Sequence, residues 1–471
     1  MKKFFTLAIV IIKDIHNNWE RIFNLLFNIL ILNCYLMKVS NYVVSKKIKD
    51  GYILFSTISK TIIKVNEEFY KEWINIKNSP LREITNENLK FLKENYFVIE
   101  DNVVEEDIID YVMNKDRLDQ VIFSSYIAFS TLCNFSCVYC YEEGQTERKH
   151  VMDIETINET LKWYESRIIE NNYKEMRITL FGGEPLIHKE LIKIFIEGIH
   201  VIAKKYDCVL SLAIVTNGYL LDNDIIDFLN KYNLVEIQIT LDGLEEKHDQ
   251  RRPLRNGGRT FHKIIENVIN AKKFNGRFLF RVSFDRNNSN DVKELLNYIS
   301  KLKISNEYQV YLAPIHNTTS QECMHCSFCN TNVYDEATDI IKQYKELYSY
   351  MKYLGLSIPK YYTNGPCMVV SNDTVLIDPY GDIYKCVEMI SLKETCVGNV
   401  KDKNYNQTYY SFVGLPSYYK CIKNKCKYVC LCGGGCLMAN YLKCKKIKGI
   451  NCEYEYFKEL IPFFLEENYD E

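Results

Sequence analysis

The chain has 471 residues, of which 47% are hydrophobic and 25% are charged, a composition typical of a folded globular protein. Its 59 basic and 61 acidic residues give a formal net charge of −2, which excludes the strongly basic surface of a general nucleic-acid-binding protein. The 18 cysteines of so large a chain favour metal or cluster ligation in a reducing compartment over a disulfide framework, so we expect a cytoplasmic protein.

Residues 1–36 hold two apolar runs, 4–12 and 22–32, separated by charged residues. Each run is shorter than the ~20 apolar residues of a membrane-spanning helix, so we expect no membrane anchor of that kind. No small-residue cleavage site follows them, which argues against a signal peptide and leaves a membrane-surface amphipathic helix as an alternative. The simpler hypothesis is that translation begins at Met37 and that the upstream segment is a start-site error, which an intact mass of the native protein would test.

Residues 37–113 predict a small α/β unit. Its expected elements are short strands at 42–44, 52–56 and 62–65 and amphipathic helices at 66–77 and 86–96. The end of the unit predicts a closing β-hairpin, with strands at 98–99 and 103–104 around the turn residues Asp101 and Asn102.

Strand and helix signals alternate through residues 120–330. The expected strands are 125–130, 176–181, 209–216, 235–241, 278–284 and 308–313, and the expected helices are 154–169, 188–205, 222–232, 261–274 and 291–302. Six strands with helical crossovers predict a parallel sheet, either doubly wound or closed into a partial barrel. Motifs that follow successive strands favour the barrel, whose chemistry gathers at the carboxyl ends of its strands.

The chain after the barrel predicts a helix at 335–354 within a linking segment, 331–366. Residues 367–453 are rich in cysteine and poor in regular periodicity, so we expect metal rather than a core of their own to organise them. The last segment, 454–471, carries an apolar face over 454–465 and predicts a docked helix.

Cys133, Cys137 and Cys140 form a C-x3-C-x2-C set just past the first expected barrel strand, with Tyr139 before the last cysteine. Three thiolates leave one iron of a cubane cluster without a protein ligand. A zinc knuckle or chance is the alternative for the triplet taken alone. The spacing resembles the radical S-adenosylmethionine (SAM) enzymes, in which the open iron binds SAM. This resemblance implies a partial (βα)6 barrel in which the three cysteines are catalytic ligands of a [4Fe-4S] cluster.

The ends of the next strands carry motifs that resemble the same family. Gly182, Gly183 and Glu184 follow the second strand, where glycine permits a close backbone approach and Glu184 is expected to bind the SAM ammonium. The resemblance assigns further SAM contacts to Tyr139, Thr240, Asp242, Arg281 and Asn288. Turn formation, or a salt bridge for Arg281, explains these residues about as well when each is taken singly. The stretch from Asp242 through 248–252 to 257–261 resembles the "S-x-D-G … H-D-x-x-R … G-x-G-x-F" pattern of peptide-modifying members.

The cysteines after residue 366 have a spacing that resembles the SPASM domain, which implies two auxiliary [4Fe-4S] clusters. The ligands carried over are Cys367, Cys386 and Cys436 for the first cluster, and Cys421, Cys426, Cys432 and Cys452 for the second. Asp373, Cys396 or an open iron that binds a substrate thiolate could complete the first cluster. Structural zinc is the alternative for the whole region. The cysteines without an assignment are Cys430 and Cys444, taken as spares, and the separate group Cys323, Cys326 and Cys329.

Together these motifs resemble radical SAM/SPASM maturases of ribosomally made peptides (RiPPs). The resemblance implies an oxidoreductase that abstracts hydrogen from a Cys-rich precursor peptide, under anaerobic conditions, and forms a thioether crosslink. Residues 37–113 are expected to bind the leader peptide by strand addition, and a flavodoxin or ferredoxin is expected to supply low-potential electrons. The alternatives are an anaerobic sulfatase-maturing enzyme and a non-catalytic iron–sulfur or zinc scaffold. The first expects an aspartate where Val387 follows Cys386, and the second predicts metal without SAM cleavage.

Overall fold

The computed structural model describes residues 37–76, 86–118, 121–142, 150–304, 306–315, 337–360, 367–390, 392–402, 404–414 and 416–469. The predictions for residues 1–36 and for Cys323, Cys326 and Cys329 lie outside these ranges. The chain divides into two compact units, an N-terminal unit of residues 1–109 and a C-terminal unit of residues 110–471. Among the described residues, no helix has the length and apolar character needed to cross a membrane.

The N-terminal unit is built on an antiparallel three-stranded sheet in the order β2 (Val43–Ile48), β3 (Gly51–Ser56) and β4 (Ile62–Val65). The helices that follow the sheet in the chain are α2 (Glu67–Ile74) and α3 (Asn86–Glu94). The side-chain oxygen of Asn66 caps α2 by accepting a hydrogen bond from the backbone N–H of Phe69 at 2.8 Å.

The predicted hairpin around Asp101 and Asn102 is wrong. β5 (Val98–Glu100) instead pairs antiparallel with β1 (Met37–Val39), a strand that the sequence did not predict. The second strand of the expected hairpin is absent because the chain there enters α4 (Glu105–Leu118). Three acidic residues in the first turn of α4 favour that helix start, since carboxylates stabilise a helix N-terminus.

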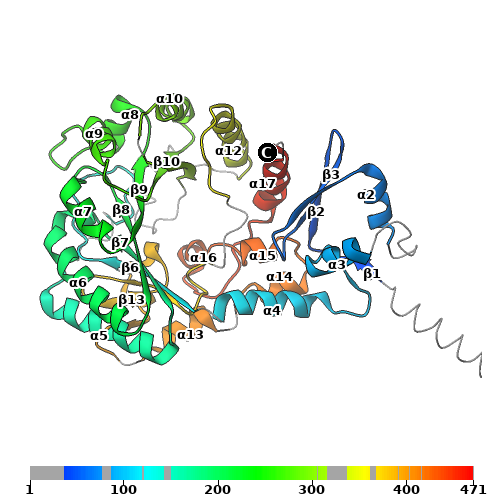
Figure 1. The fold of residues 1–471 in the computed structure, drawn as a ribbon, viewed down its shortest axis with the longest axis horizontal. Helices are drawn as coiled ribbons and strands as arrows, with labels where there is room; N and C mark the ends of the chain where they lie inside the picture. The colour runs from blue at the N-terminus through cyan, green and yellow to red at the C-terminus, as the bar shows by residue number, and fades with distance from the viewer. Residues whose placement is uncertain are drawn as a thin grey trace, which may run out of the picture. The chain divides into compact units, whose positions relative to one another are not determined.

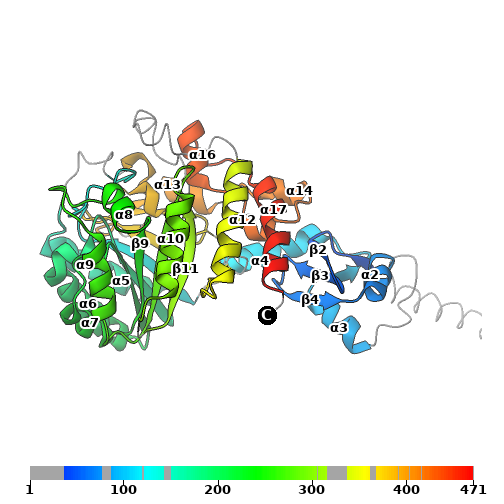
Figure 2. The same cartoon turned by 90° about the horizontal axis from the view of Figure 1, so that it is seen from above.

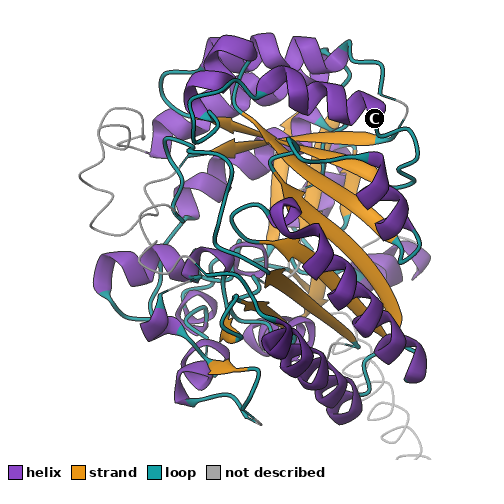
Figure 3. Ribbon diagram, turned by 90° about the vertical axis from the view of Figure 1, so that its left-hand side faces the viewer, coloured by secondary structure: helices purple, strands orange, loops and turns teal. Residues whose placement is uncertain are grey.

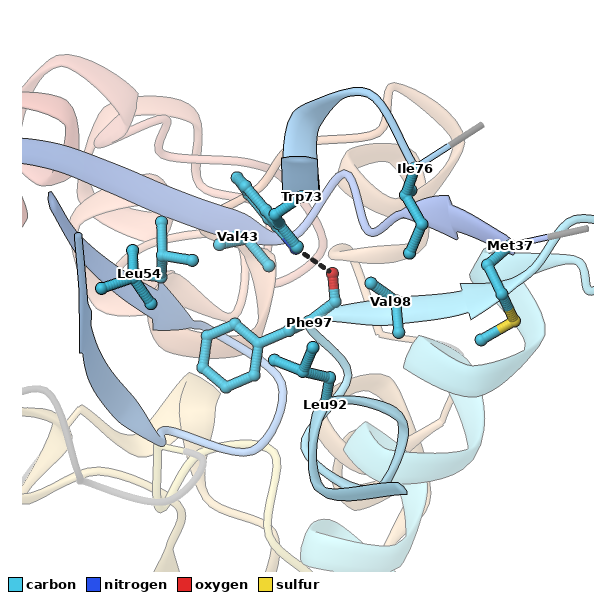
Figure 4. Packing of buried hydrophobic residues seen from close by; sticks show 9 residues of the cluster. Met37, Val43, Leu54, Trp73, Ile76, Leu92, Phe97 and Val98 are labelled. Carbon is cyan, nitrogen blue, oxygen red and sulfur yellow. Dashed lines mark hydrogen bonds between the residues drawn. The ribbon is translucent and has the colours of Figure 1, made fainter. Parts of the chain in front are cut away.

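One apolar cluster holds the N-terminal unit together (Figure 4). Its buried members are Met37, Val43, Leu54, Val65, Trp73, Ile76, Leu92, Phe97 and Val98. The indole Nε1–H of Trp73 donates to the backbone carbonyl of Phe97 at 3.2 Å, so the largest ring in the cluster also satisfies its polar atom.

Leu54→Ala is expected to lower the free energy of unfolding of the N-terminal unit by about 2–5 kcal/mol, because truncation of a fully buried leucine leaves a cavity. Amide hydrogen exchange of β3 measures this opening separately from the rest of the chain. Ile62→Ala on β4 is the matched control, since Ile62 is 36% exposed. Equal losses in the two variants would contradict the packing argument.

Six parallel strands in sequential order form the main sheet of the C-terminal unit (Figures 1 and 3). They are β6 (Ile122–Ala128), β7 (Glu175–Phe181), β8 (Val209–Thr216), β9 (Leu234–Leu241), β10 (Arg277–Phe284) and β11 (Tyr308–Pro314). The helices between them are α5 (Ile154–Asn171), α6 (Lys189–Lys205), α7 (Asn223–Asn230), α8 (Glu245–Arg251), α9 (Phe261–Asn270) and α10 (Ser289–Ser300). The strand order never reverses, so right-handed crossovers bring the helices to one face, and the predicted partial (βα)6 barrel is confirmed.

The face of the barrel sheet away from these helices carries several polar side chains. Side chains alternate between two faces along a strand, and the buried apolar residues occupy the helix side. The partly exposed alternate positions, called here the interior face, include Tyr126, Thr179, Gln238, Arg281 and Tyr311. A barrel interior lined in this way can hold a polar ligand.

The cysteine-rich region contains regular structure that the sequence did not predict. β12 (Thr374–Ile377) pairs parallel with β6, and β13 (Asp382–Tyr384) and β14 (Gly398–Asn399) continue the same sheet antiparallel. Short helices follow, namely α13 (Gln407–Val413), α14 (Tyr419–Lys423), α15 (Val429–Cys432) and α16 (Leu437–Cys444). Part of this region is therefore organised by strand addition to the open edge of the barrel.

The last helix docks as predicted. α17 (Tyr454–Glu467) lies beside α12 (Ala337–Tyr353), as Figures 1 and 2 both show. The ring of Phe464 packs on those of Tyr348 and Tyr344, with centroid separations of 4.9 Å and 5.9 Å.

Candidate active site

The cysteine triplet lies in the loop that follows β6, at the carboxyl end of the barrel strands. Its three thiols are not joined in disulfide bonds and are partly exposed. Residues 251–255 pair antiparallel with this loop through a bridge between Phe135 and Leu254. The N–H of Ser136 donates to the carbonyl of Pro253 at 2.9 Å, and that of Val138 to the carbonyl of Arg251 at 3.0 Å. The backbone around Cys137 is thus held by the segment that follows β9 and α8.

The glycines after β7 bring that strand end against the triplet loop. Glu184 N–H donates to the carbonyl of Leu132 at 2.9 Å, and Gly183 N–H to that of Ser130 at 3.2 Å. A Cβ at Gly183 would lie 2.3 Å from the Leu132 oxygen, and Gly182 has a φ of +120° that side chains rarely adopt. The close backbone approach expected for these glycines is made to the protein's own loop.

Gly183→Ala is therefore expected to displace the triplet loop and to lower the free energy of unfolding by about 1–3 kcal/mol, as overpacking does. Thermal unfolding and iron uptake by the purified protein measure the two effects. Gly398→Ala is the control, because a Cβ there would meet its nearest neighbour, Tyr405, at an ordinary 3.5 Å. Unchanged iron uptake in Gly183→Ala would show that the loop tolerates the shift.

Glu184 is buried between the ends of β7 and β8. Its carboxylate accepts hydrogen bonds from Thr216 Oγ1 and Asn217 N, both at 2.7 Å, and from Leu186 N at 3.0 Å. Burial raises the pKa of Glu184, although these bonds act in the opposite direction. The side-chain nitrogen Nδ2 of Asn217 lies 3.9 Å from Cys133 Sγ. Asn217 therefore stands between Glu184, the residue predicted to bind the SAM ammonium, and the triplet.

A buried polar network joins the triplet loop to the ends of β9 and β10. The Tyr139 hydroxyl donates to Asp242 Oδ1 at 2.8 Å, and Arg251 Nε donates to Asp242 Oδ2 at 3.1 Å. Arg251 also binds Asp285 at 2.7 Å. Burial raises the pKa of Asp242, but the charges of Arg252 and Arg251 outweigh it and hold the pKa below its usual value.

Two of the predicted SAM contacts, Asp242 and Asn288, are fully buried and are bonded to the protein itself. Asn288 Nδ2 donates to the carbonyls of Asp242 at 3.4 Å and Ser283 at 3.2 Å. The sequence reasoning missed the central position of Arg251. Its adjacency to the H-D motif is the one signal that could have indicated it.

Thr240 and Arg281 are neighbours on β9 and β10. Arg281 Nη1 donates to Ser283 Oγ at 2.8 Å, and its charge also acts on Glu388, which follows β13. Burial raises the pKa of Glu388 and the Arg281 cation opposes that rise. The Arg281 cation of the interior face therefore lies near a carboxylate of the cysteine-rich region, an arrangement that the sequence reasoning did not identify.

The three cysteines predicted for the first auxiliary cluster lie near one another. Burial raises the pKa of the Cys367, Cys386 and Cys436 thiols, and the charge of Glu388 raises each of them further. The charge of Cys367 also raises the pKa of the Cys386 and Cys436 thiols.

Asp373 and Cys396, the two residues considered as the fourth ligand of this group, have other partners. Asp373 accepts a hydrogen bond from the Tyr173 hydroxyl, and Cys396 Sγ lies 3.1 Å from the carbonyl of Gly398.

The cysteines predicted for the second auxiliary cluster also lie within electrostatic reach of one another. Burial raises the pKa of the Cys421 thiol, and the charges of Cys426 and Cys452 raise it further. Burial also raises the pKa of the Cys432 thiol, and the charges of Cys421 and Cys426 add to that rise. The chain between the two groups turns at Gly435, whose φ is +84° and where a Cβ would lie 1.7 Å from the Asn451 oxygen. Among the described residues, no three Cys, His, Asp or Glu side chains converge as a site for a single metal ion.

Comparison with known proteins finds a family match over the barrel. Residues 127–299 match the family model of the Radical SAM superfamily. An uncharacterized protein of Methanocaldococcus jannaschii is 24% identical over 272 residues, which are 58% of this chain and 86% of that protein. The radical SAM cyclopropyl synthase TigE of Paramaledivibacter caminithermalis is 26% identical over 304 residues, 57% of this chain and 62% of TigE.

Two solved structures share the fold over most of their length. Native anSMEcpe with bound AdoMet and the Cp18Cys peptide gives a TM-score of 0.55 at 20% identity, covering 74% of this chain and 97% of that one. Streptococcus suis SuiB bound to the precursor peptide SuiA gives a TM-score of 0.51 at 14% identity, covering 89% and 99%. At these identities the likeness establishes the fold.

Proposed function

We propose that this chain, whose residues 127–299 match the model of the Radical SAM superfamily, is a radical SAM peptide maturase. It modifies a ribosomally made, Cys-rich precursor peptide by abstracting hydrogen and joining a cysteine sulfur to carbon as a thioether. The observation that carries the proposal is the combination of one cysteine triplet at the carboxyl ends of the barrel strands with two further cysteine groups in the same unit. SuiB and anSMEcpe, which share the fold, were each solved with a bound peptide.

The residues present fit the groups that this chemistry needs. Three thiols outside disulfide bonds lie on one loop that tight backbone contacts hold in place, and they are a donor set for iron. When bound there, the cluster and SAM supply a 5′-deoxyadenosyl radical. Cys133, Cys137 and Cys140 would hold the cluster, while Glu184 and Arg281 would bind the charged ends of SAM.

The chain's own residues also explain how the site keeps its geometry. Glu184 ties the end of β7 to that of β8, and Arg251 ties Asp242 to Asp285 across β9 and β10. These bonds are buried, so water does not compete for them and the strand ends cannot separate independently. The interior face is left to orient the peptide.

The remaining parts of the proposal concern partners and location. The N-terminal unit binds the leader of the peptide by adding it as a strand to the sheet formed by β2, β3 and β4. The two auxiliary cysteine groups hold [4Fe-4S] clusters that accept the electron released by oxidation of the peptide. A cytoplasmic flavodoxin or ferredoxin reduces the SAM-binding cluster.

The test is an anaerobic incubation of the reconstituted protein with SAM, dithionite and a cysteine-rich peptide encoded beside its gene. We expect deoxyadenosine, a peptide lighter by two hydrogens per crosslink, and one alkylatable thiol fewer for each crosslink. A cyclopropane would remove two hydrogens without changing the thiol count, and formylglycine formation from cysteine would remove the sulfur. Metal binding without SAM cleavage would overturn the proposal in favour of a scaffold.

A further inference from the structure

The segment that pairs with the triplet loop places Arg252 opposite Cys137. The bridge between Phe135 and Leu254, and the backbone bonds from Ser136 to Pro253 and from Val138 to Arg251, share one antiparallel register. In that register the residue facing Cys137 is Arg252. The hydrogen bonds on either side of this pair fix the position of the arginine backbone relative to the cysteine.

The Arg252 side chain is buried against the same loop. It is 8% exposed, its Nη1 donates to the Tyr139 hydroxyl at 2.8 Å, and its guanidinium lies over the Phe135 ring at 5.9 Å. Its partners therefore stand two residues to either side of Cys137. Within the described residues, Nε of Arg252 is buried without a hydrogen-bond partner, which leaves one donor for a group that is added to the site.

The neighbouring arginine has a different environment. Arg251 forms ion pairs with both Asp242 and Asp285, so two carboxylates compensate its charge. Arg252 hydrogen bonds to the Tyr139 hydroxyl, and its positive charge acts on Cys137 of the triplet loop as well as on Asp242. A buried guanidinium stays protonated, so it is a fixed positive charge beside the cluster ligands.

We propose that Arg252 is a positioning residue whose charge, held against the triplet loop, sets the reduction potential of the cluster bound by Cys133, Cys137 and Cys140. The inference rests on the proposed function in one respect, that the triplet holds a [4Fe-4S] cluster. Reduction adds one negative charge to an already anionic group, and a cation in a site of low dielectric constant stabilises the reduced form. Loss of Arg252 therefore makes the cluster harder to reduce.

The test compares Arg252→Gln, Arg252→Lys and wild type by potentiometric titration followed by electron paramagnetic resonance. The SAM-binding cluster is the one whose signal changes when SAM is added. For Arg252→Gln we expect the ratio of reduced to oxidised cluster at a fixed potential to fall at least tenfold, a shift of 59 mV to more negative potential for one electron. Arg252→Lys keeps the charge and is expected to retain most of the wild-type potential.

Arg259→Gln is the control for the removal of a positive charge, because Arg259 is 80% exposed and pairs with Glu245 at the surface. Equal potentials in Arg252→Gln and Arg259→Gln would overturn the inference, as would a shift in Arg252→Lys as large as that in Arg252→Gln. If Arg252→Gln takes up no iron at the triplet, loading of Arg252→Lys at the wild-type potential supports the role of charge, and failure of both refutes it. A wild-type protein without a SAM-responsive cluster would instead refute the proposed function.

Discussion

Replacement of Cys133, Cys137 and Cys140 together by alanine is expected to reduce the formation of deoxyadenosine from SAM to the level seen without protein. The three thiolates are the proposed iron ligands in the loop after β6, and SAM cleavage needs the cluster that they hold. Chromatography of the SAM products measures this loss. Iron bound per chain is expected to fall by one cluster's content, because the C-terminal cysteine groups remain.

Cys208→Ala is the matched control for this variant. Cys208 is buried at the start of β8, so it lies at the amino ends of the parallel strands, opposite to the triplet. Burial raises the pKa of its thiol to about 11, as expected for a core cysteine. The control is expected to cleave SAM at the wild-type rate. SAM cleavage that persists in the triple variant would show that iron is held elsewhere and would remove the basis of the proposed function.

The barrel could be predicted from the sequence because both of its signals are local. The strand β8 was predicted with its observed bounds, and the start of the helix α5 was predicted correctly at residue 154. Each barrel strand contains alternating buried apolar residues, and the crossover helices have an apolar stripe. Strands whose partners are distant in the chain were missed. β1 has three residues and β12 has four, and their pairing with β5 and β6 cannot be read from so few positions.

The candidate site was predictable as a set of residues but not as a set of contacts. The resemblance to the SPASM domain implied which cysteines belong together, and in the structure the charges of Cys367, Cys386 and Cys436 act on one another. The contacts of Arg252 depend on a backbone register between two loops, and no periodicity in the sequence encodes it. The protein partners of Glu184 and Asn288 likewise depend on how neighbouring strands end.

Cys436→Ala is expected to leave SAM cleavage intact while product formation on the peptide falls to background. Cys436 belongs to the first auxiliary group, and its sulfur caps α16 by accepting from Ala439 N–H at 3.4 Å. The charge of Glu388 raises the pKa of the Cys436 thiol, and the Arg281 cation opposes the rise in the pKa of Glu388. Glu388 therefore lies near both the first auxiliary group and the interior face, where the peptide would bind. Without an electron acceptor there, hydrogen abstraction cannot proceed to a stable crosslink.

The measurement is the ratio of crosslinked peptide to deoxyadenosine in the same reaction, which isolates the later step from SAM cleavage. Cys444→Ala is the control, because Cys444 is an exposed thiol at the other end of α16 and was predicted to be a spare. It is expected to keep the wild-type ratio. A Cys436→Ala protein that crosslinks peptide at the wild-type ratio would show that the first auxiliary group does not take part in the oxidation, and the cysteine-rich region would then have a structural role.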